Sequence, residues 1–172
     1  MNKKKNMLRA YLCAGLAVLL AVALDQYTKY LAITYLKDQK PISLIPGIFE
    51  LHYLENTGAA FGMLQNKLVF FVIGALGFSL ILAYFFGKFP LNKRIFPLRI
   101  CMVLGSAGAI GNLIDRLYHR YVVDFFYFKL INFPIFNVAD IYVVVACALF
   151  LILTFFYYKE EDFETLFPKK TK

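Results

Sequence analysis

Four long apolar stretches constrain this chain more than any other feature, because each can cross a membrane as a helix. They lie at about residues 10–36, 68–87, 95–116 and 138–158. A spanning helix needs about 20 predominantly apolar residues, and the first stretch reaches that length with a mixed extension. Hydrophobic residues make up 60% of the 172, which is typical of a membrane domain and not of a soluble globule. We therefore predict one all-α membrane domain, residues 1–172, with four transmembrane helices.

Positive charge is concentrated at the amino terminus, in the turn between the second and third stretches, and in the tail. Cytoplasmic loops of membrane proteins carry an excess of Lys and Arg. This distribution predicts that both termini are cytoplasmic and that the extracytoplasmic segments cover about residues 37–67 and 117–137. Some basic residues in those segments count against this orientation, but the cytoplasmic clusters are denser. The net charge of +8 therefore indicates topology, and we expect no nucleic-acid partner.

The first extracytoplasmic segment is predicted to hold a small β element. Pro46-Gly47 is a turn signal, and residues 48–55 are rich in strand-forming side chains with partial alternation. A small sheet lying on the membrane surface fits this pattern. The following residues, 56–62, are mostly small. We expect a loop there in which Asn56 or the backbone approaches a ligand closely; a plain turn is the alternative.

Polar groups recur at helical spacing inside two of the apolar stretches. Asp25 and Lys29 are four residues apart, so they share a helix face and can form an ion pair, either at a helix end or in a site. Gly108, Asn112 and Arg116 also follow one another every four residues. Glycine lets a helix or a substrate approach the backbone, whereas a guanidinium suits a carbonyl, carboxylate or phosphate. We expect packing at Gly108 and binding at Asn112 and Arg116.

Two carboxylates, Asp124 and Asp140, stand where apolar helices are expected to meet the outer edge of the membrane. An aspartate at the centre of a span costs roughly 2.5–3.5 kcal/mol on insertion scales, so acids near a span indicate a functional site. Asp124 has a strand-like context. Asn137 stands at an expected helix start with Asp140 three residues later, which is also the spacing of a capping box. Spacing alone leaves the catalytic and the capping interpretations open.

The other residue types limit the available chemistry. The two histidines, His52 and His119, lie far apart in expected loops, so a metal site or a histidine-based triad is poorly supported. Two neighbouring carboxylates can instead share one proton. The ionised acid then takes a proton from water, and the protonated acid polarises a peptide carbonyl, as in aspartic proteases. We expect no metal and no cofactor.

Five motifs together resemble bacterial lipoprotein signal peptidase, a family also called signal peptidase II. They are Asp25-x-x-x-Lys29, residues 55–61 (Glu-Asn-Thr-Gly-Ala-Ala-Phe), residues 111–116 (Gly-Asn-Leu-Ile-Asp-Arg), residues 123–125 (Val-Asp-Phe) and residues 136–140 (Phe-Asn-Val-Ala-Asp). Each motif is weak alone, but their order and combination are specific and cover nearly the whole chain.

The resemblance implies an intramembrane aspartyl endopeptidase of the bacterial cytoplasmic (inner) membrane, with its active site at the extracytoplasmic face. It implies removal of signal peptides from diacylglyceryl-modified prolipoproteins, with the cut just before the lipid-modified cysteine. The implied partners are these prolipoproteins, membrane lipids and the inhibitor globomycin. The implied catalytic dyad is Asp124 and Asp140, and Asp115 is expected to support the structure through Arg116 or the loop. The residues implied to shape the site or position substrate are Asp25, Lys29, Asn56, Gly108, Asn112, Arg116 and Asn137.

Two other functions remain as alternatives to proteolysis. A small proton-coupled transporter would use the same acidic residues, but such transporters often show internal repeats and polar groups near the bilayer midplane. No repeat is visible here, and the acids cluster at one predicted face. A non-catalytic membrane assembly factor would need Asn137 and Asp140 only to cap a helix. Asp140→Asn separates these possibilities, because asparagine caps well but cannot serve in a carboxylate dyad.

Overall fold

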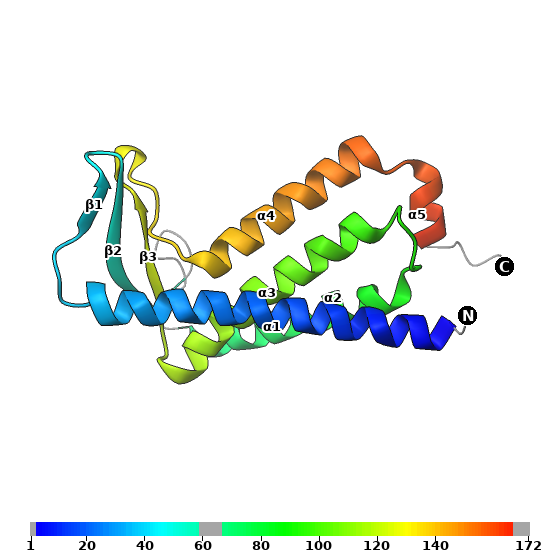
Figure 1. Ribbon diagram of the computed structural model, residues 1–172, viewed down its shortest axis with the longest axis horizontal. Coiled ribbons are helices and arrows are strands. Elements are labelled where there is room, and N and C mark those ends of the chain that lie inside the picture. Colours follow the sequence, from blue (N-terminus) through cyan, green and yellow to red (C-terminus); the bar gives the residue numbers. More distant parts are fainter. Residues whose placement is uncertain (1–2, 59–66, 167–172) are drawn as a thin grey trace.

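The computed structural model describes residues 3–58 and 67–166 and is mainly helical. Four described helices are long and apolar enough to cross a membrane, which confirms the predicted architecture. The long helices are α1 (Lys3–Leu36), α2 (Leu68–Lys88), α3 (Phe96–Tyr118) and α4 (Val138–Ile152), the last continued by a π-helical turn at Leu153–Tyr157. A sheet of β1 (Ile42–Ile45), β2 (Phe49–Asn56) and β3 (Val122–Phe128) lies at one end, and the short helix α5 (Glu160–Leu166) lies at the other (Figure 1).

Helix α1 is longer than the predicted first span at its amino-terminal end. It begins at Lys3 and not near residue 10, because lysine is a strong helix former that continues the helix outside the apolar region. Its 34 residues correspond to about 51 Å, well beyond the ~30 Å hydrocarbon core. The far end of α1 therefore reaches the sheet, where Ala32 and Leu36 pack against Val123 and Phe125 of β3.

The turn between α2 and α3 is formed by the residues that the sequence marks as helix stops. Phe89 precedes Pro90 and adopts an extended backbone (φ −77°, ψ 149°), which ends α2 at Lys88, close to the end of the predicted second stretch. The Oδ1 atom of Asn92 then accepts the N–H of Ile95 at 2.8 Å, at the start of α3. Helix α5 was not predicted. Its Asp162 pairs with Arg94 at 2.8 Å, so the turn holds the tail in place.

The predicted β element is confirmed, and it is completed by a strand from far along the chain. The strand order is β1-β2-β3, and neighbouring strands are antiparallel. A turn at residues 46–48, with Gly47 at φ +73°, connects β1 to β2. Strand β3 pairs with β2 so that Leu54 faces Asp124 and Asn56 faces Val122. This register brings the end of β2 beside Asp124.

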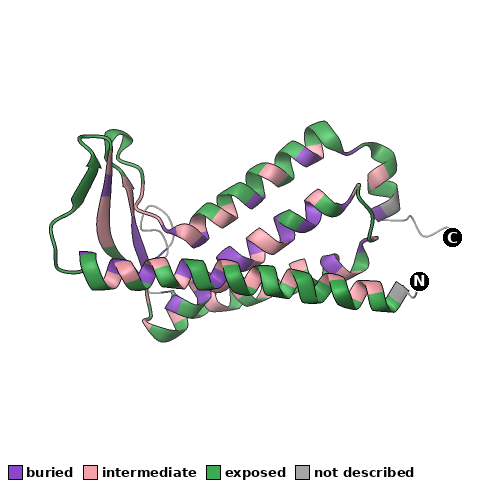
Figure 2. Cartoon of the chain, in the orientation of Figure 1, coloured by how far each residue is buried: buried purple, intermediate pink, exposed green. Residues whose placement is uncertain are grey.

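Helix α3 is the centre of the helical part, with α1, α2 and α4 packed around it. It is the most buried of the four long helices (Figure 2). Small residues on α3 permit this packing: a Cβ atom at Gly108 would lie 2.5 Å from the carbonyl oxygen of Ala139 in α4. The interpretation of Gly108 as a packing residue therefore agrees with its position.

Replacing Gly108 with alanine is expected to lower thermal stability. The new methyl group would also lie 2.6 Å from Cγ2 of Val143, so α3 and α4 must move apart. Overpacking of this kind typically costs about 1–3 kcal/mol. Gly74→Ala in α2 is the matched control, because nothing lies within 4 Å of its Cβ position and loss of a helical glycine stabilises by roughly 0.5–1 kcal/mol. Thermal unfolding in detergent measures both, and equal shifts would contradict the packing role.

Candidate active site

The structure brings Asp124 and Asp140 together through one residue, Asn137. The side-chain N–H of Asn137 donates to Oδ1 of Asp124 at 2.6 Å. The backbone N–H of Asn137 donates to Oδ2 of Asp140 at 3.1 Å. Asp124 lies on β3 and Asp140 in the first turn of α4, so the start of α4 joins the two carboxylates.

Asn137 and Asp140 also form the capping box that their spacing suggests. Oδ1 of Asn137 accepts the backbone N–H of Asp140 at 3.0 Å, and the carboxylate of Asp140 accepts the backbone N–H of Asn137 in return. The cap uses only the oxygen of the Asn137 amide. Its nitrogen remains directed at Asp124, so capping and dyad geometry coexist.

Asp124 is almost fully buried, and both of its oxygens accept hydrogen bonds from side-chain amides. Nδ2 of Asn56, at the end of β2, donates to Oδ2 of Asp124 at 2.8 Å. Oδ1 of Asn56 accepts the N–H of Gly58 at 2.9 Å, which fixes the amide. The remainder of that predicted small-residue loop, from residue 59 onward, lies outside the described residues. Burial, followed by the charge of Asp140, raises the pKa of Asp124 to about 7.

Asn112 connects the dyad to a buried cation. Its Nδ2 atom donates to Oδ1 of Asp140 at 2.8 Å. Its Oδ1 atom accepts from Nζ of Lys29 at 2.9 Å and from Nδ2 of Asn137 at 3.1 Å. The prediction that Asn112 belongs to the site agrees with these contacts, which orient one carboxylate of the pair.

The predicted ion pair between Asp25 and Lys29 is confirmed at 2.9 Å, and it lies in the interior. Lys29 makes a second ion pair with Asp115 at 3.0 Å. All three side chains are at most 3% exposed. Oδ1 of Asp25 also accepts the backbone N–H of Ala139 at 2.8 Å. This group therefore joins α1, α3 and α4 directly behind the dyad.

Asp115, a member of this group, and the neighbouring Gln26 make further contacts, and those of Gln26 were not predicted from the sequence. Oδ2 of Asp115 accepts the N–H of Val123 at 3.0 Å, so its support of the structure acts through the loop. Nε2 of Gln26 donates to Oδ1 of Asp115 at 2.8 Å and to the carbonyl oxygen of Gly111 at 3.2 Å. A glutamine beside Asp25 in an apolar stretch was the available signal for a buried polar network.

Both carboxylates line one cavity of about 430 Å³. Arg116 lies in its wall, where Nη2 donates to the carbonyl oxygen of Gly58 at 3.2 Å and the guanidinium lies 4.5 Å from the ring centre of Phe71. Of the predicted site residues, Asn56, Asn112, Arg116, Asp124 and Asp140 line the cavity, whereas Asp25, Lys29, Gly108 and Asn137 lie behind its wall. The rest of the lining is mainly apolar side chains from α4 and residues 133–136.

The cavity presents two carboxylates, side-chain amides and the guanidinium of Arg116 as its polar groups. Within residues 3–58 and 67–166, no group of three or more His, Cys, Asp or Glu side chains is arranged to hold a metal ion. The two carboxylates can hold one proton between them, because the charge of Asp140 opposes ionisation of Asp124. A water molecule placed between them would have the ionised carboxylate as its proton acceptor. A carbonyl group placed there would have the protonated carboxyl as its proton donor.

Replacing Lys29 with methionine is expected to destabilise the fold strongly. Removal of the ammonium leaves Asp25 and Asp115 buried without a counter-charge, which costs about 3–5 kcal/mol. Lys37→Met is the matched control: Lys37 pairs with Glu55 at the same 2.9 Å, but these side chains are 41% and 39% exposed. An exposed pair contributes about 0–1 kcal/mol. Unfolding of both variants in one detergent tests the difference, and similar losses would refute the role of burial.

The comparisons with known proteins agree with this geometry. The family model of signal peptidase II matches residues 17–156. Lipoprotein signal peptidases of Caldanaerobacter subterraneus subsp. tengcongensis and Clostridioides difficile are 46% and 42% identical over 140 and 145 residues. These alignments cover 81% and 83% of this chain and 93% and 94% of the relatives. A bacterial membrane enzyme solved by the in meso method at 2.3 Å superposes with a TM-score of 0.75 at 31% identity, covering 93% of this chain and 94% of that one. The chain therefore belongs to the signal peptidase II family.

Proposed function

We propose that this protein removes signal peptides from prolipoproteins by an aspartyl mechanism in which Asp124 and Asp140 are the catalytic dyad. Membership of the signal peptidase II family supports the substrate and the proteolytic activity. One observation carries the mechanism: the two carboxylates line the same cavity and are joined by Asn137.

In the proposed reaction, the ionised carboxylate of Asp140 takes a proton from water, and the resulting nucleophile attacks the peptide carbonyl carbon. The protonated carboxyl of Asp124 donates its proton to the carbonyl oxygen as the tetrahedral intermediate forms. Collapse of the intermediate breaks the C–N bond: the proton held by Asp140 passes to the leaving amine, and the hydroxyl formed on the carbonyl oxygen returns its proton to Asp124 as the C=O bond forms again. The dyad then again holds one proton.

The surroundings of the two acids support this assignment of the proton. Asp140 lies at the amino-terminal end of α4, where the helix dipole stabilises negative charge, and it accepts two N–H donors. The nearest ammonium, that of Lys29, reaches Asp140 through Asn112. The raised pKa of Asp124 favours its protonated form near neutral pH. The helix terminus beside Asp140 is the difference between the two environments that supports Asp140 as the base and Asp124 as the acid.

The apolar wall of the cavity supports a substrate that is already in the membrane. Ile141, Val144 and Val145 of α4 line the cavity and are also exposed on the outer surface of the helix. Acyl chains of a diacylglyceryl-modified cysteine can pack there, which places the adjacent peptide bond at the dyad. We further propose that globomycin binds in this cavity, and that the sheet end faces away from the cytoplasm while both termini face it.

Neither alternative function has a specific observation in its favour. Membership of a peptidase family argues against a proton-coupled transporter. An assembly factor would need Asn137 and Asp140 only as a cap, yet Asn137 also binds Asp124 and Asn112. These extra bonds have no part in capping.

Asp124→Asn and Asp140→Asn are each expected to abolish cleavage of a diacylglyceryl-modified prolipoprotein by purified enzyme. Loss of a general acid or base typically lowers the rate by roughly 10²–10⁴-fold. Asp38→Asn is the matched control, because Asp38 is exposed and its φ of 60° is one that asparagine tolerates. The product is analysed by mass spectrometry, and the unmodified precursor is assayed in parallel.

Cleavage just before the modified cysteine, insensitive to chelator and absent from both folded dyad variants, is the expected result. An Asp140→Asn variant that keeps full activity would reduce Asp140 to a capping residue and refute the dyad. Equal cleavage of modified and unmodified precursors would refute the proposed role of the acyl chains.

The cleavage rate is expected to fall as the pH rises above about 7. The pKa of Asp124 is raised to about 7, so the proton of the dyad is present below this pH and is lost above it. The doubly ionised dyad has no acid to donate, and the rate then declines by about tenfold for each further pH unit. Initial rates are measured across this range, with circular dichroism at each pH to confirm that the fold is retained. A rate that stays constant or rises above neutral pH would contradict the assignment.

A further inference from the structure

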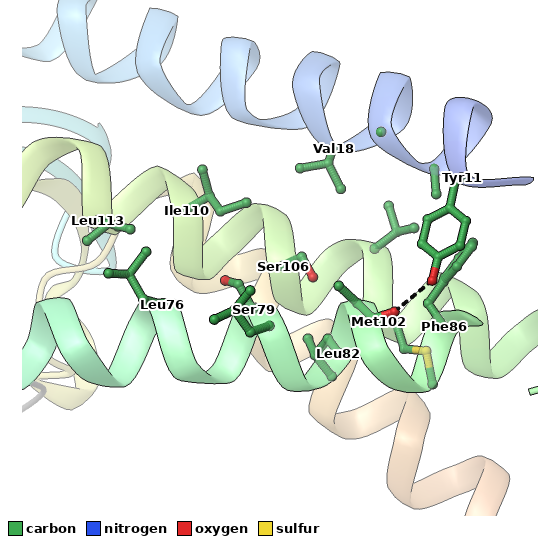
Figure 3. A pocket seen from close by; sticks show the side chains of 15 residues that line it. Tyr11, Val18, Leu76, Ser79, Leu82, Phe86, Met102, Ser106, Ile110 and Leu113 are labelled. Carbon is green, nitrogen blue, oxygen red and sulfur yellow. Dashed lines mark hydrogen bonds between the residues drawn. The ribbon is translucent and has the colours of Figure 1, made fainter. Parts of the chain in front are cut away.

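A second cavity, of about 400 Å³, lies between α1, α2 and α3 and shares no lining residue with the catalytic cavity (Figure 3). Its walls are apolar apart from Tyr11, Ser79 and Ser106. Leu76 and Leu80 of α2 line it and are also exposed on the outer surface, so the cavity is continuous with the region occupied by lipid. An apolar chain is the occupant that this lining fits.

One end of the cavity adjoins a buried arginine. Figure 3 shows Tyr11, Phe86 and Met102 together at that end. The guanidinium of Arg99 lies 4.3 Å from the ring centre of Phe86. On α3, Arg99 precedes the lining residue Val103 by four positions, so it continues the lining face of that helix by one turn. Arg99 does not line the cavity itself but lies next to it, against the lining residue Phe86, at the end away from the sheet.

The protein provides hydrogen-bond acceptors for only part of the Arg99 guanidinium. Its side chain is 5% exposed, and Nη2 donates to the carbonyl oxygen of Phe89 at 2.7 Å. Its Nε and Nη1 atoms have no hydrogen-bond partner in the described part of the chain. A buried guanidinium without a counter-charge is costly. Its fork of donors fits the oxygens of a phosphate group.

We propose that this cavity with Arg99 binds an anionic phospholipid, the phosphate at the guanidinium and one acyl chain between α1, α2 and α3. Arg99 is near the membrane edge, where a phospholipid has its phosphate. The apolar cavity extends inward from there, where the lipid has its acyl chains. Basic pockets between transmembrane helices bind anionic head groups in this manner. The bound lipid links the amino-terminal half of α1 to α2 and α3, far from the dyad.

Quenching of a single tryptophan by brominated lipids tests the proposal, because the chain has no tryptophan of its own. Phe86→Trp places the indole at the junction of cavity and arginine. In mixed vesicles, brominated phosphatidylglycerol is expected to occupy this site about fivefold more readily than brominated phosphatidylcholine, because both carry a phosphodiester but only phosphatidylcholine adds a quaternary ammonium that the guanidinium repels. Phe156→Trp is the matched reporter of bulk lipid, because Phe156 is 86% exposed; there the two lipids should quench equally.

Further substitutions, each added to the Phe86→Trp variant, test which residues cause the selectivity for the anionic lipid. Arg99→Gln should abolish it, whereas Lys93→Gln, which removes an exposed charge at the same end of the molecule, should leave it unchanged. Gly15→Leu should lower quenching by both lipids, since Gly15 lines the cavity and nothing lies within 4 Å of its Cβ position. If Arg99→Gln does not fold, Arg99→Lys, which keeps the charge without the fork, should weaken the selectivity.

Four results would overturn the proposal. Equal quenching of Phe86→Trp by the two lipids would show that no anionic head group is bound. Selectivity that survives substitution of Arg99, or that is as strong at Phe156→Trp, would reduce the effect to general attraction between a basic protein and an anionic membrane. Quenching of Phe86→Trp that Gly15→Leu leaves unchanged would place the acyl chain outside the cavity.

Discussion

The arrangement of the sheet end of the molecule depends on the ammonium group of Lys29. A cation with 3% of its side chain exposed is tolerated only when its charge and donors are matched, and here two carboxylates and one amide oxygen surround it. Asp25 in turn holds the first turn of α4, and Asp115 holds the start of β3. One buried charge thus fixes the relative positions of α1, α3, α4 and the sheet, which are the elements that supply the site.

This arrangement also determines which way the amides around the dyad face. Lys29 is a donor without acceptor capacity, so it requires the oxygen of the Asn112 amide. The nitrogen of the same amide must then face Asp140, at 2.8 Å. Nδ2 of Asn137 also donates to the oxygen of the Asn112 amide, and it donates to Oδ1 of Asp124 as well. The carboxylates are therefore positioned before any substrate arrives, which is the condition for electrostatic stabilisation of a transition state.

Much of this organisation could be predicted from the sequence because its signals are local. Apolar length located four spans, the four-residue spacing located the ion pair of Asp25 and Lys29, and Asn137 marked the start of α4. Spacing could not reveal that β3 pairs with β2, because register depends on contacts between segments far apart in the chain. For the same reason the contacts of Gln26 were missed, and the acidic tail gave no signal for α5, which depends on a distant arginine.

The capping box is compatible with both of the roles, structural and chemical, that the sequence left open for Asn137 and Asp140. An asparagine cap needs only its side-chain oxygen, so the amide nitrogen of Asn137 is free to serve a second partner without loss to the helix. In this fold that partner is Asp124, and the reciprocal bond from the backbone of Asn137 holds Asp140. The start of α4 thus sets the geometry of both carboxylates through a single residue. A change at Asn137 would alter helix and dyad together, whereas a change at Asp124 affects only the dyad, so the two positions separate the structural from the chemical contribution.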